Sequence, residues 1–258
     1  MHLVDVHAHL DHPDFEKDLP DVIKRASARG VVCTIAQGLN HESNLRVLTL
    51  CNQHPEVQAA LGLYPCEALT VSVEPGYTRE TVVSVEETLA FIESKNEEIV
   101  AIGEVGLDFK ESHDKENQIA VFRQIVQLAK KIHKPLIIHS RKAEQAVLDV
   151  LEEEHYTRAI MHCFCGKKKL LQRGVDMGLY FSIPTSVTRN QQFQDNVALL
   201  PMQHILTETD APYMAPMKDL RNEPANIKDA VEKIAELKRM ESVEVANQLY
   251  FNYQKLFG

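Results

Sequence analysis

The chain has 258 residues but no tryptophan, and aromatic residues make up only 6% of it. Positive charge is also scarce, because 28 Lys and Arg stand against 37 Asp and Glu and give a formal net charge of -9. Proteins that bind nucleic acid along an extended surface use basic patches and stack bases on aromatic side chains. These deficits argue against such a surface, although divalent cations and a few local basic residues can reverse the potential inside one cleft.

Long apolar runs, targeting signals and cysteine pairs are missing as well. No apolar run is long enough to cross a bilayer, and the N-terminus lacks the basic and apolar regions of a signal peptide. The five cysteines contain no CxxC pair, which speaks against a zinc knuckle and a disulfide framework. No Pro/Gly/Ser-rich linker divides the chain. We therefore expect one domain over residues 1–258, located in the cytoplasm and without membrane contact.

The chain does contain a set of apolar runs that end at potential metal ligands. The first is MHLVDVHAHLD, in which a strand over Leu3–Val6 leads to His7 and His9. Strand side chains two positions apart share a face, so the two imidazoles lie side by side with Asp5 behind them. These side chains could therefore supply about half of the ligands of a metal site.

Four later apolar runs also stop at a histidine or an acidic residue. They are EIVAIGEVGLD (Glu104, then Asp108), KPLIIHSR (His139), RAIMHCF (His162) and HILTETDAP (Glu208 and Asp210, again two apart and so on one face). Chance readily gives one or two such endings. Five of them indicate a common geometry.

Strand-like and helix-like segments alternate between these endings. The expected strands are Leu3–Val6, Val31–Ala36, Val57–Leu63, Ile99–Glu104, Pro135–His139, Ala159–His162, Leu179–Ile183 and Ile205–Glu208. The clearest helices are Asn117–Ile132, Ala143–Leu151, Lys167–Met177 and a final one that runs to Phe257 with Ser242 as its N-cap. This pattern predicts an α/β fold, a (β/α)8 TIM barrel, with a doubly wound open sheet as the alternative. Only the closed ring easily brings all the strand ends to one rim.

The motifs VDVHAHLD, AIGEVGLDF, PLIIHSR, MHCFCG and TETDAPYMAP, in this order and spacing, resemble those of the TatD family of metal-dependent hydrolases. That family belongs to the amidohydrolase-like barrels. The resemblance extends from Met1 to the terminal helix, where NYQKLF is similar to the closing pattern of the family. An HxH motif alone is a weak signal, but the five motifs together are highly specific.

The resemblance implies a centre of two divalent metal ions. One ion would be held by His7, His9, Glu104 and Asp210. The other would be held by His139, His162 and the shared Glu104. The histidine-rich donors favour Zn, Mn, Fe or Ni over Mg. Two close cations can activate a water and clamp the oxygens of a phosphodiester, so Glu104 and Asp210 are the catalytic candidates, with Asp210 orienting the water or accepting its proton.

Further residues would support the metal centre or bind the substrate. Asp5 and Glu208 are candidates to fix imidazole tautomers or to hold a metal-bound water. Arg141, two residues after His139, and Arg221, in the loop after the last strand, could each make a forked contact with a phosphate. Tyr64 is the third candidate for substrate binding, since its phenol can donate a hydrogen bond to a phosphate.

The chain departs from the family pattern where substrate is expected to bind. Members commonly carry His-Pro-His after the third strand, whereas GLYPCEA places Tyr64 and Cys66 at the two histidine positions. Neither side chain can take the positive charge of an imidazolium. Lys142 replaces an Asp that often follows the Ser-Arg pair, and Cys165 replaces the usual Ser of CFSG. The implied metal ligands are all present.

We expect a divalent-metal phosphodiesterase, in particular a 3′-to-5′ exodeoxyribonuclease that acts on single-stranded DNA. The alternative within enzymes is hydrolysis of a small amide, ester or lactone at the same metal centre, which amidohydrolase-like barrels also perform. A metal-binding protein without turnover is the third interpretation. The complete set of implied ligands favours the two enzymatic interpretations over it.

Overall fold

The computed structural model describes residues 1–67, 84–111 and 114–258. Eight parallel strands lie in the order in which they occur in the chain. They are β1 (Leu3–Ala8), β2 (Val31–Gln37), β3 (Val57–Leu61), β4 (Ala101–Gly106), β5 (Leu136–His139), β6 (Ala159–Met161), β7 (Tyr180–Pro184) and β8 (Ile205–Glu208). The consecutive order confirms the (β/α)8 barrel and excludes the doubly wound sheet, in which the strand order reverses.

The barrel closes between β1 and the segment that follows β8. The amide of Asp210 donates to the carbonyl of His7 (2.9 Å), and the amide of His9 donates to the carbonyl of Ala211 (2.8 Å). Thr207 Oγ1 adds a hydrogen bond to the carbonyl of Val4 (2.8 Å). Two potential ligands near the beginning of the chain and one near its end are thereby held next to one another.

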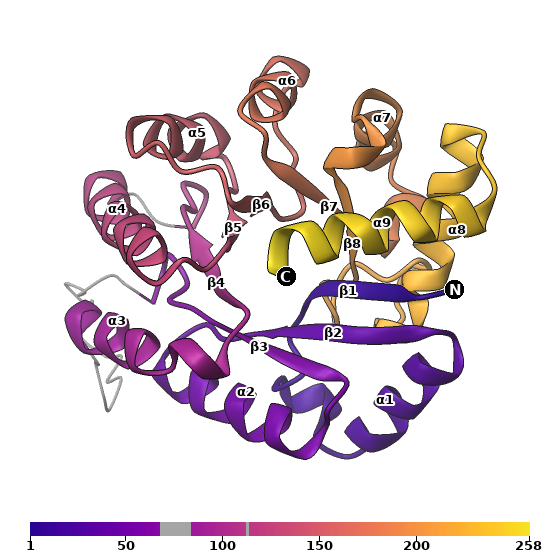
Figure 1. Cartoon of the computed structure of the whole chain (residues 1–258), viewed down its shortest axis with the longest axis horizontal. Coiled ribbons are helices and arrows are strands. Elements are labelled where there is room, and N and C mark those ends of the chain that lie inside the picture. The colour runs from indigo at the N-terminus through magenta and orange to yellow at the C-terminus, as the bar shows by residue number, and fades with distance from the viewer. Residues whose placement is uncertain (68–83, 112–113) are drawn as a thin grey trace.

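Helices surround the strands (Figure 1). They are α1 (Leu19–Ala28), α2 (His41–Gln53), α3 (Val85–Ser94), α4 (Lys115–Ile132), α5 (Glu144–Glu153), α6 (Lys168–Asp176), α7 (Gln191–Leu199), α8 (Ile227–Lys238) and α9 (Ser242–Phe257). Their apolar faces pack on the sheet, as in α4, where Val121, Phe122 and Ile125 are buried. Within the described residues, no helix combines the length and the apolar character that crossing a membrane requires.

The last helix, α9, closes the end of the barrel at which the strands begin. Asn252 Nδ2 donates to the carbonyl of Ile205, the first residue of β8 (2.7 Å), and Leu256 packs in the same cluster as the apolar side chains that fill the barrel. The N-cap of α9 is Glu241, which forms a capping box with Glu244. The prediction of Ser242 as the N-cap was therefore wrong by one residue, because Ser242 already has a helical backbone.

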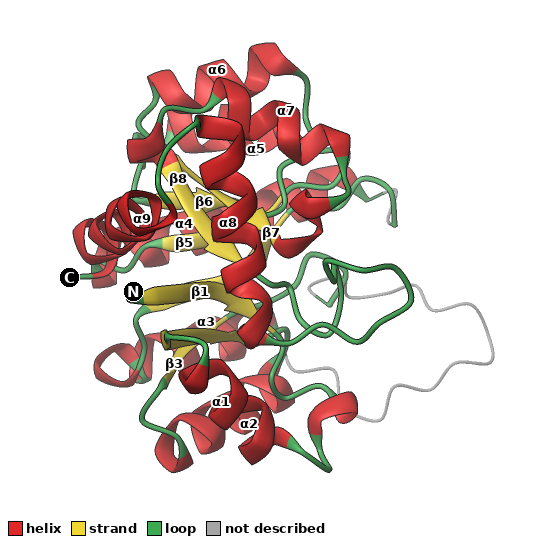
Figure 2. Ribbon diagram, turned by 90° about the vertical axis from the view of Figure 1, so that its right-hand side faces the viewer, coloured by secondary structure: helices red, strands yellow, loops and turns green. Residues whose placement is uncertain are grey.

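Because α9 covers the end of the barrel at which the strands begin, a functional site is expected at the end where the strands finish. Figure 2 shows both termini on one side of the molecule and the loops that follow the strands on the other. Close backbone packing at this end needs a glycine after β3, because a Cβ on Gly62 would lie 2.4 Å from the carbonyl oxygen of Glu104. Gly62 therefore allows β4 to bring Glu104 to its place beside β3.

Candidate metal centre

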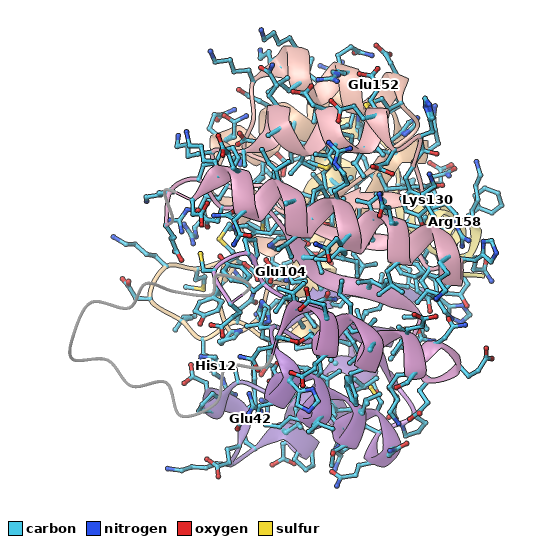
Figure 3. All side chains as sticks on the ribbon, turned by 90° about the vertical axis from the view of Figure 1, so that its left-hand side faces the viewer. His12, Glu42, Glu104, Lys130, Glu152 and Arg158 are labelled. Carbon is cyan, nitrogen blue, oxygen red and sulfur yellow. The ribbon has the colours of Figure 1, made fainter. Side chains whose placement is uncertain are left out.

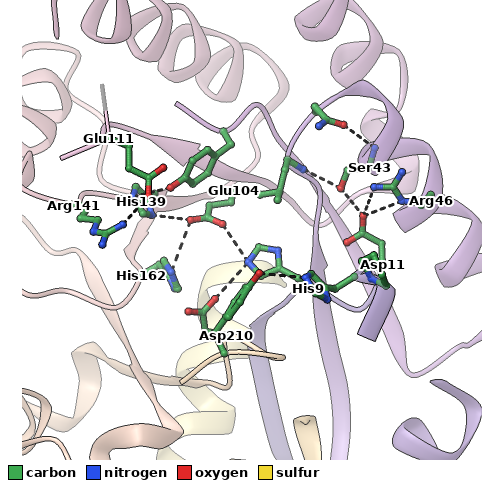
Figure 4. A pocket seen from close by; sticks show the side chains of 16 residues that line it. His9, Asp11, Ser43, Arg46, Glu104, Glu111, His139, Arg141, His162 and Asp210 are labelled. Carbon is green, nitrogen blue, oxygen red and sulfur yellow. Dashed lines mark hydrogen bonds and ion pairs between the residues drawn. The ribbon is translucent and has the colours of Figure 1, made fainter. Parts of the chain in front are cut away.

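The six implied ligands converge at the carboxyl ends of the strands. They are His7 at the end of β1, His9 just after it, Glu104 on β4, His139 at the end of β5, His162 just after β6 and Asp210 after β8. All except His7 line one cavity of about 520 Å³, and Figure 4 shows their side chains turned toward one another. His7 is fully buried and does not line the cavity.

Four ligand atoms form a compact group around a common centre. His7 Nε2 and His9 Nε2 are 3.3 Å apart, and each lies 3.4–3.5 Å from both Glu104 Oε2 and Asp210 Oδ1. The edge of a regular tetrahedron is about 1.6 times the distance from its centre to a corner, so separations of this length correspond to roughly 2.1 Å between ion and ligand, the usual Zn–N and Zn–O distance. The five separations are therefore of the size expected for donors that share one divalent cation.

The other oxygen of Glu104 faces a second group. Glu104 Oε1 lies 2.9 Å from His139 Nδ1 and 3.9 Å from His162 Nε2. These three residues could hold an ion of their own, since their ligand atoms lie within 4.8 Å of one another. The carboxylate of Glu104 thus presents one oxygen to each group, which is the arrangement that a bridging ligand needs.

Buried carboxylates orient two of the imidazoles. Glu208 Oε2 lies 2.7 Å from His162 Nδ1 and accepts a hydrogen bond from Ser182 Oγ (2.6 Å). Asp108 Oδ2 lies 2.9 Å from His139 Nε2. In both histidines the opposite ring nitrogen is thereby directed toward Glu104. Such carboxylate–histidine pairs fix the tautomer and orientation of metal-ligating imidazoles.

Asp5 makes different contacts from those expected of it. Its carboxylate accepts hydrogen bonds from the amide and hydroxyl of Thr209 and from the backbone amide of His7, and it contacts no imidazole nitrogen. Asp5 therefore links the end of β1 to the segment after β8. The Nδ1 atoms of His7 and His9 are buried without a hydrogen-bond partner.

Opposite charges compensate one another in this buried cluster. Burial alone would raise the pKa of Glu104, but hydrogen bonds with His139 and His7 hold that pKa well below its usual range. Burial disfavours protonated His139 and His162, yet contacts with Asp108 and Glu104 raise the pKa of His139 to about 9, and the charges of Glu208 and Asp210 raise that of His162 to about 10. Without metal, imidazolium groups thus supply positive charge that cations can replace.

Metal affinity is expected to fall as the pH falls. The pKa values of His139 and His162, about 9 and about 10, lie above neutral pH, so both imidazoles carry protons in the metal-free protein. A metal ion can bind only after these protons leave. Each displaced proton changes the apparent affinity about tenfold per pH unit below the pKa. Chelator-competition titrations with Zn²⁺ at pH 6, 7 and 8 measure this slope, and an affinity independent of pH would contradict it.

The Glu208→Gln variant is expected to lower metal affinity by about 10- to 100-fold, the usual cost of losing a carboxylate that orients a ligating histidine. The amide keeps the volume of the side chain but removes the charge beside His162. Glu152→Gln is the matched control, since Glu152 is an exposed residue of α5 and lies well apart from Glu104 in Figure 3. Equal affinities in the two variants would show that Glu208 does not orient His162.

Two of the three expected substrate contacts line the cavity. The hydroxyl of Tyr64 lies 3.3 Å from both Asp108 Oδ2 and His139 Nε2. Arg141 lies in the same cavity, with Nη1 2.9 Å from Glu111 Oε1. Cys66, at the other position where the family commonly has histidine, does not line this cavity.

The structure does not bring Arg221 to the cavity. Its guanidinium pairs with the carboxylate of Asp18 at 2.7 and 2.8 Å and lies over the ring of Phe15, 4.8 Å from the centroid. Arg221 therefore ties the loop after β8 to the segment before α1.

Sequence reasoning assigned no role to several side chains that shape the site. Asp108 was recognised only as the end of an apolar run, although its position four residues after Glu104 was the available signal. Ser182 lies on β7 and Arg46 on α2, and neither belongs to a motif. Their roles depend on contacts across strands and helices that no local pattern contains.

The fold and the site together define a metal-dependent hydrolase of the (β/α)8 class, with histidines and carboxylates gathered where the parallel strands end. The family described as TatD related DNase matches residues 4–258. The chain belongs to that family.

Individual relatives match along nearly the whole chain. Human deoxyribonuclease TATDN3 is 35% identical over 261 residues, which cover 99% of this chain and 94% of that protein. The metal-dependent hydrolase YabD of Bacillus subtilis is 34% identical and covers 99% and 98% of the two chains. The crystal structure of the Escherichia coli TatD homologue YJJV superimposes with a TM-score of 0.86 at 29% identity, covering 99% and 97%.

Proposed function

We propose that this protein hydrolyses phosphodiester bonds in DNA and removes nucleotides from the 3′ end of single strands. The observation that carries the proposal is the position of Glu104, whose two carboxylate oxygens face two separate groups of metal ligands. The residues from His7 to Asp210 contribute to one site, which supports a single catalytic domain over residues 1–258. The five cysteines, all of them within the described residues, form no disulfide, which supports the proposal that the protein acts in the reducing cytoplasm.

The proposed ligands are those whose geometry fits. His7, His9, Glu104 and Asp210 would hold one ion, and His139, His162 and Glu104 the other. Two divalent ions supply an activated water and neutralise negative charge on a phosphate. Zn, Mn, Fe or Ni suits these donors, whereas Mg prefers a shell of oxygens.

The remaining side chains bind substrate and move protons. Asp210 faces both His9 and the cavity, so its carboxylate can accept a proton from the attacking water. Arg141 would donate two hydrogen bonds to a phosphate in place of its contact with Glu111, and Tyr64 would donate one more. The cavity lies in the size range of sites that enclose small ligands, which favours a strand end over a duplex.

A substrate panel on metal-reconstituted protein tests this proposal. Single-stranded DNA, double-stranded DNA, bis(p-nitrophenyl) phosphate and small lactones are assayed with Mn²⁺ and with Zn²⁺. We expect 5′-labelled single strands to shorten stepwise from their 3′ ends, faster than the duplex. Shortening from the 5′ end, or internal cuts, would contradict the exonuclease assignment, and no turnover of any phosphodiester would contradict the proposal as a whole.

The second candidate function is hydrolysis of a small amide, ester or lactone. It is favoured by Tyr64 and Cys66, which replace two histidines that are common in the family, so that neither of these two positions can supply an imidazolium charge. Turnover of the lactones but of no phosphodiester in the same panel would select it.

A further inference from the structure

A second arginine reaches the same cavity from another element. Arg46 on α2 lines it together with Asn40 and Ser43. Figure 4 shows Arg46 and Arg141 on opposite sides of Glu104. The candidate metal centre therefore lies between two guanidinium groups, of which only Arg141 has a role in the proposed function.

One edge of the Arg46 guanidinium is held in place by the carboxylate of Asp11. Its Nε and Nη2 atoms donate to Asp11 Oδ2 at 3.2 and 3.1 Å. The side chain of Asp11 is only 6% exposed, and the same oxygen accepts a hydrogen bond from Ser43 Oγ (2.7 Å). A buried, doubly anchored carboxylate thus sets the orientation of Arg46 before any ligand arrives.

The other edge of the guanidinium faces a partner that is easily displaced. Arg46 Nη1 donates to Glu42 Oε1 at 2.7 Å, but the side chain of Glu42 is 85% exposed. Ion pairs between exposed side chains contribute little stability, and the carboxylate of Glu42 can swing into solvent. A phosphate can then take its place, because guanidinium groups bind phosphate through paired hydrogen bonds.

We propose that Arg46 binds a second phosphate of the same DNA strand, at least one nucleotide away from the phosphate that lies at the metal ligands. This inference rests on the proposed function and extends it, since the ligand is an oligonucleotide with more than one phosphate. A strand that spans the cavity would contact Arg141 on one side of Glu104 and Arg46 on the other. The site therefore favours longer strands over a dinucleotide, although the chain as a whole is acidic.

Binding of a labelled oligonucleotide tests the inference directly. Phosphorothioate linkages keep the strand intact on the metal-loaded protein, and fluorescence anisotropy gives the dissociation constant at several salt concentrations. For single strands, each phosphate contact contributes about 0.7 to the slope of log affinity against log salt. We expect Arg46→Gln to reduce this slope by about 0.7 and to weaken binding about tenfold at low salt.

Matched variants separate phosphate binding from a structural role. Arg46→Lys keeps the charge and is expected to restore most of the slope. Glu42→Gln removes the competing carboxylate and is expected to tighten binding about threefold. Arg29→Gln removes an arginine that pairs with Asp229 outside the cavity and is expected to leave the slope unchanged.

The gain from lengthening the substrate is a second readout. In the wild-type protein, kcat/KM is expected to rise several-fold from a dinucleotide to a tetranucleotide, and Arg46→Gln is expected to abolish most of this rise. An unchanged salt slope in Arg46→Gln, or a slope that Arg46→Lys fails to restore, would overturn the inference. A wild-type protein that binds the oligonucleotide with the expected slope but hydrolyses no strand would instead overturn the proposed function and leave the phosphate site standing.

Discussion

The Glu104→Ala variant is expected to lose both metal ions and, with them, its hydrolytic activity. Among the six proposed ligands, Glu104 is the one with an oxygen in each donor group, 3.4 Å from His9 Nε2 and 2.9 Å from His139 Nδ1. Its removal leaves Asp210 as the remaining carboxylate of the first group, leaves the second group with its two imidazoles, and removes the ligand that the two groups share. A water that is no longer held by metal has a pKa far above neutral pH, so the rate should fall by several orders of magnitude.

Metal content per chain and the rate on single-stranded DNA are the two measurements for this variant. Glu111→Ala is the control for metal content, because Glu111 lines the same cavity but belongs to neither donor group. It should retain the wild-type number of ions. A full complement of two ions in Glu104→Ala would refute the bridging role.

The Asp210→Asn variant is expected to lower kcat by about 10²- to 10⁴-fold, the usual effect of removing a positioned proton acceptor. The amide oxygen can still face His7 and His9, so metal should be bound more weakly but not be lost. Asp219→Asn, a change at an exposed residue of the same loop, should leave kcat unchanged. Normal metal binding together with full activity in Asp210→Asn would show that Asp210 is not the base.

The barrel could be predicted because its strands are short apolar runs that alternate with helix-like segments. β8 was placed at its observed bounds, and the bounds of β2, β5 and β6 differ from the prediction by a single residue. β4 was placed two residues too early, and β3 was extended to Leu63 although it ends at Leu61. Apolar residues continue beyond a strand when they also pack in the core, so the pattern does not show where pairing stops.

The histidines at the end of β1 were the easiest part of the site to predict. His7 and His9 lie on the same side, with their Nε2 atoms 3.3 Å apart, as expected for side chains two positions apart in an extended segment. The same rule was less successful for Glu208 and Asp210. Asp210 lies beyond β8 with a φ of 57°, so strand alternation no longer applies, and the two carboxylates contact different histidines.

Contacts between elements that are far apart in the chain could not be predicted from the sequence. Arg141 could be placed because it follows His139 on the same strand end, whereas Arg46 reaches the cavity from a helix and is oriented by Asp11. Arg221 was expected to face the cavity because of its position after β8, yet Asp18 and Phe15 hold it elsewhere. The spacing of residues along the sequence identifies the ligands at the strand ends. Which side chains from loops and helices also reach the cavity depends on tertiary packing.

Anomalous diffraction from crystals grown with Zn²⁺ or Mn²⁺ tests the central claim most directly. The account predicts two anomalous peaks about 3.5–4 Å apart. One should lie among His7, His9 and Asp210, the other between His139 and His162, with the carboxylate of Glu104 between them. A single peak, or two peaks on the same side of Glu104, would contradict it.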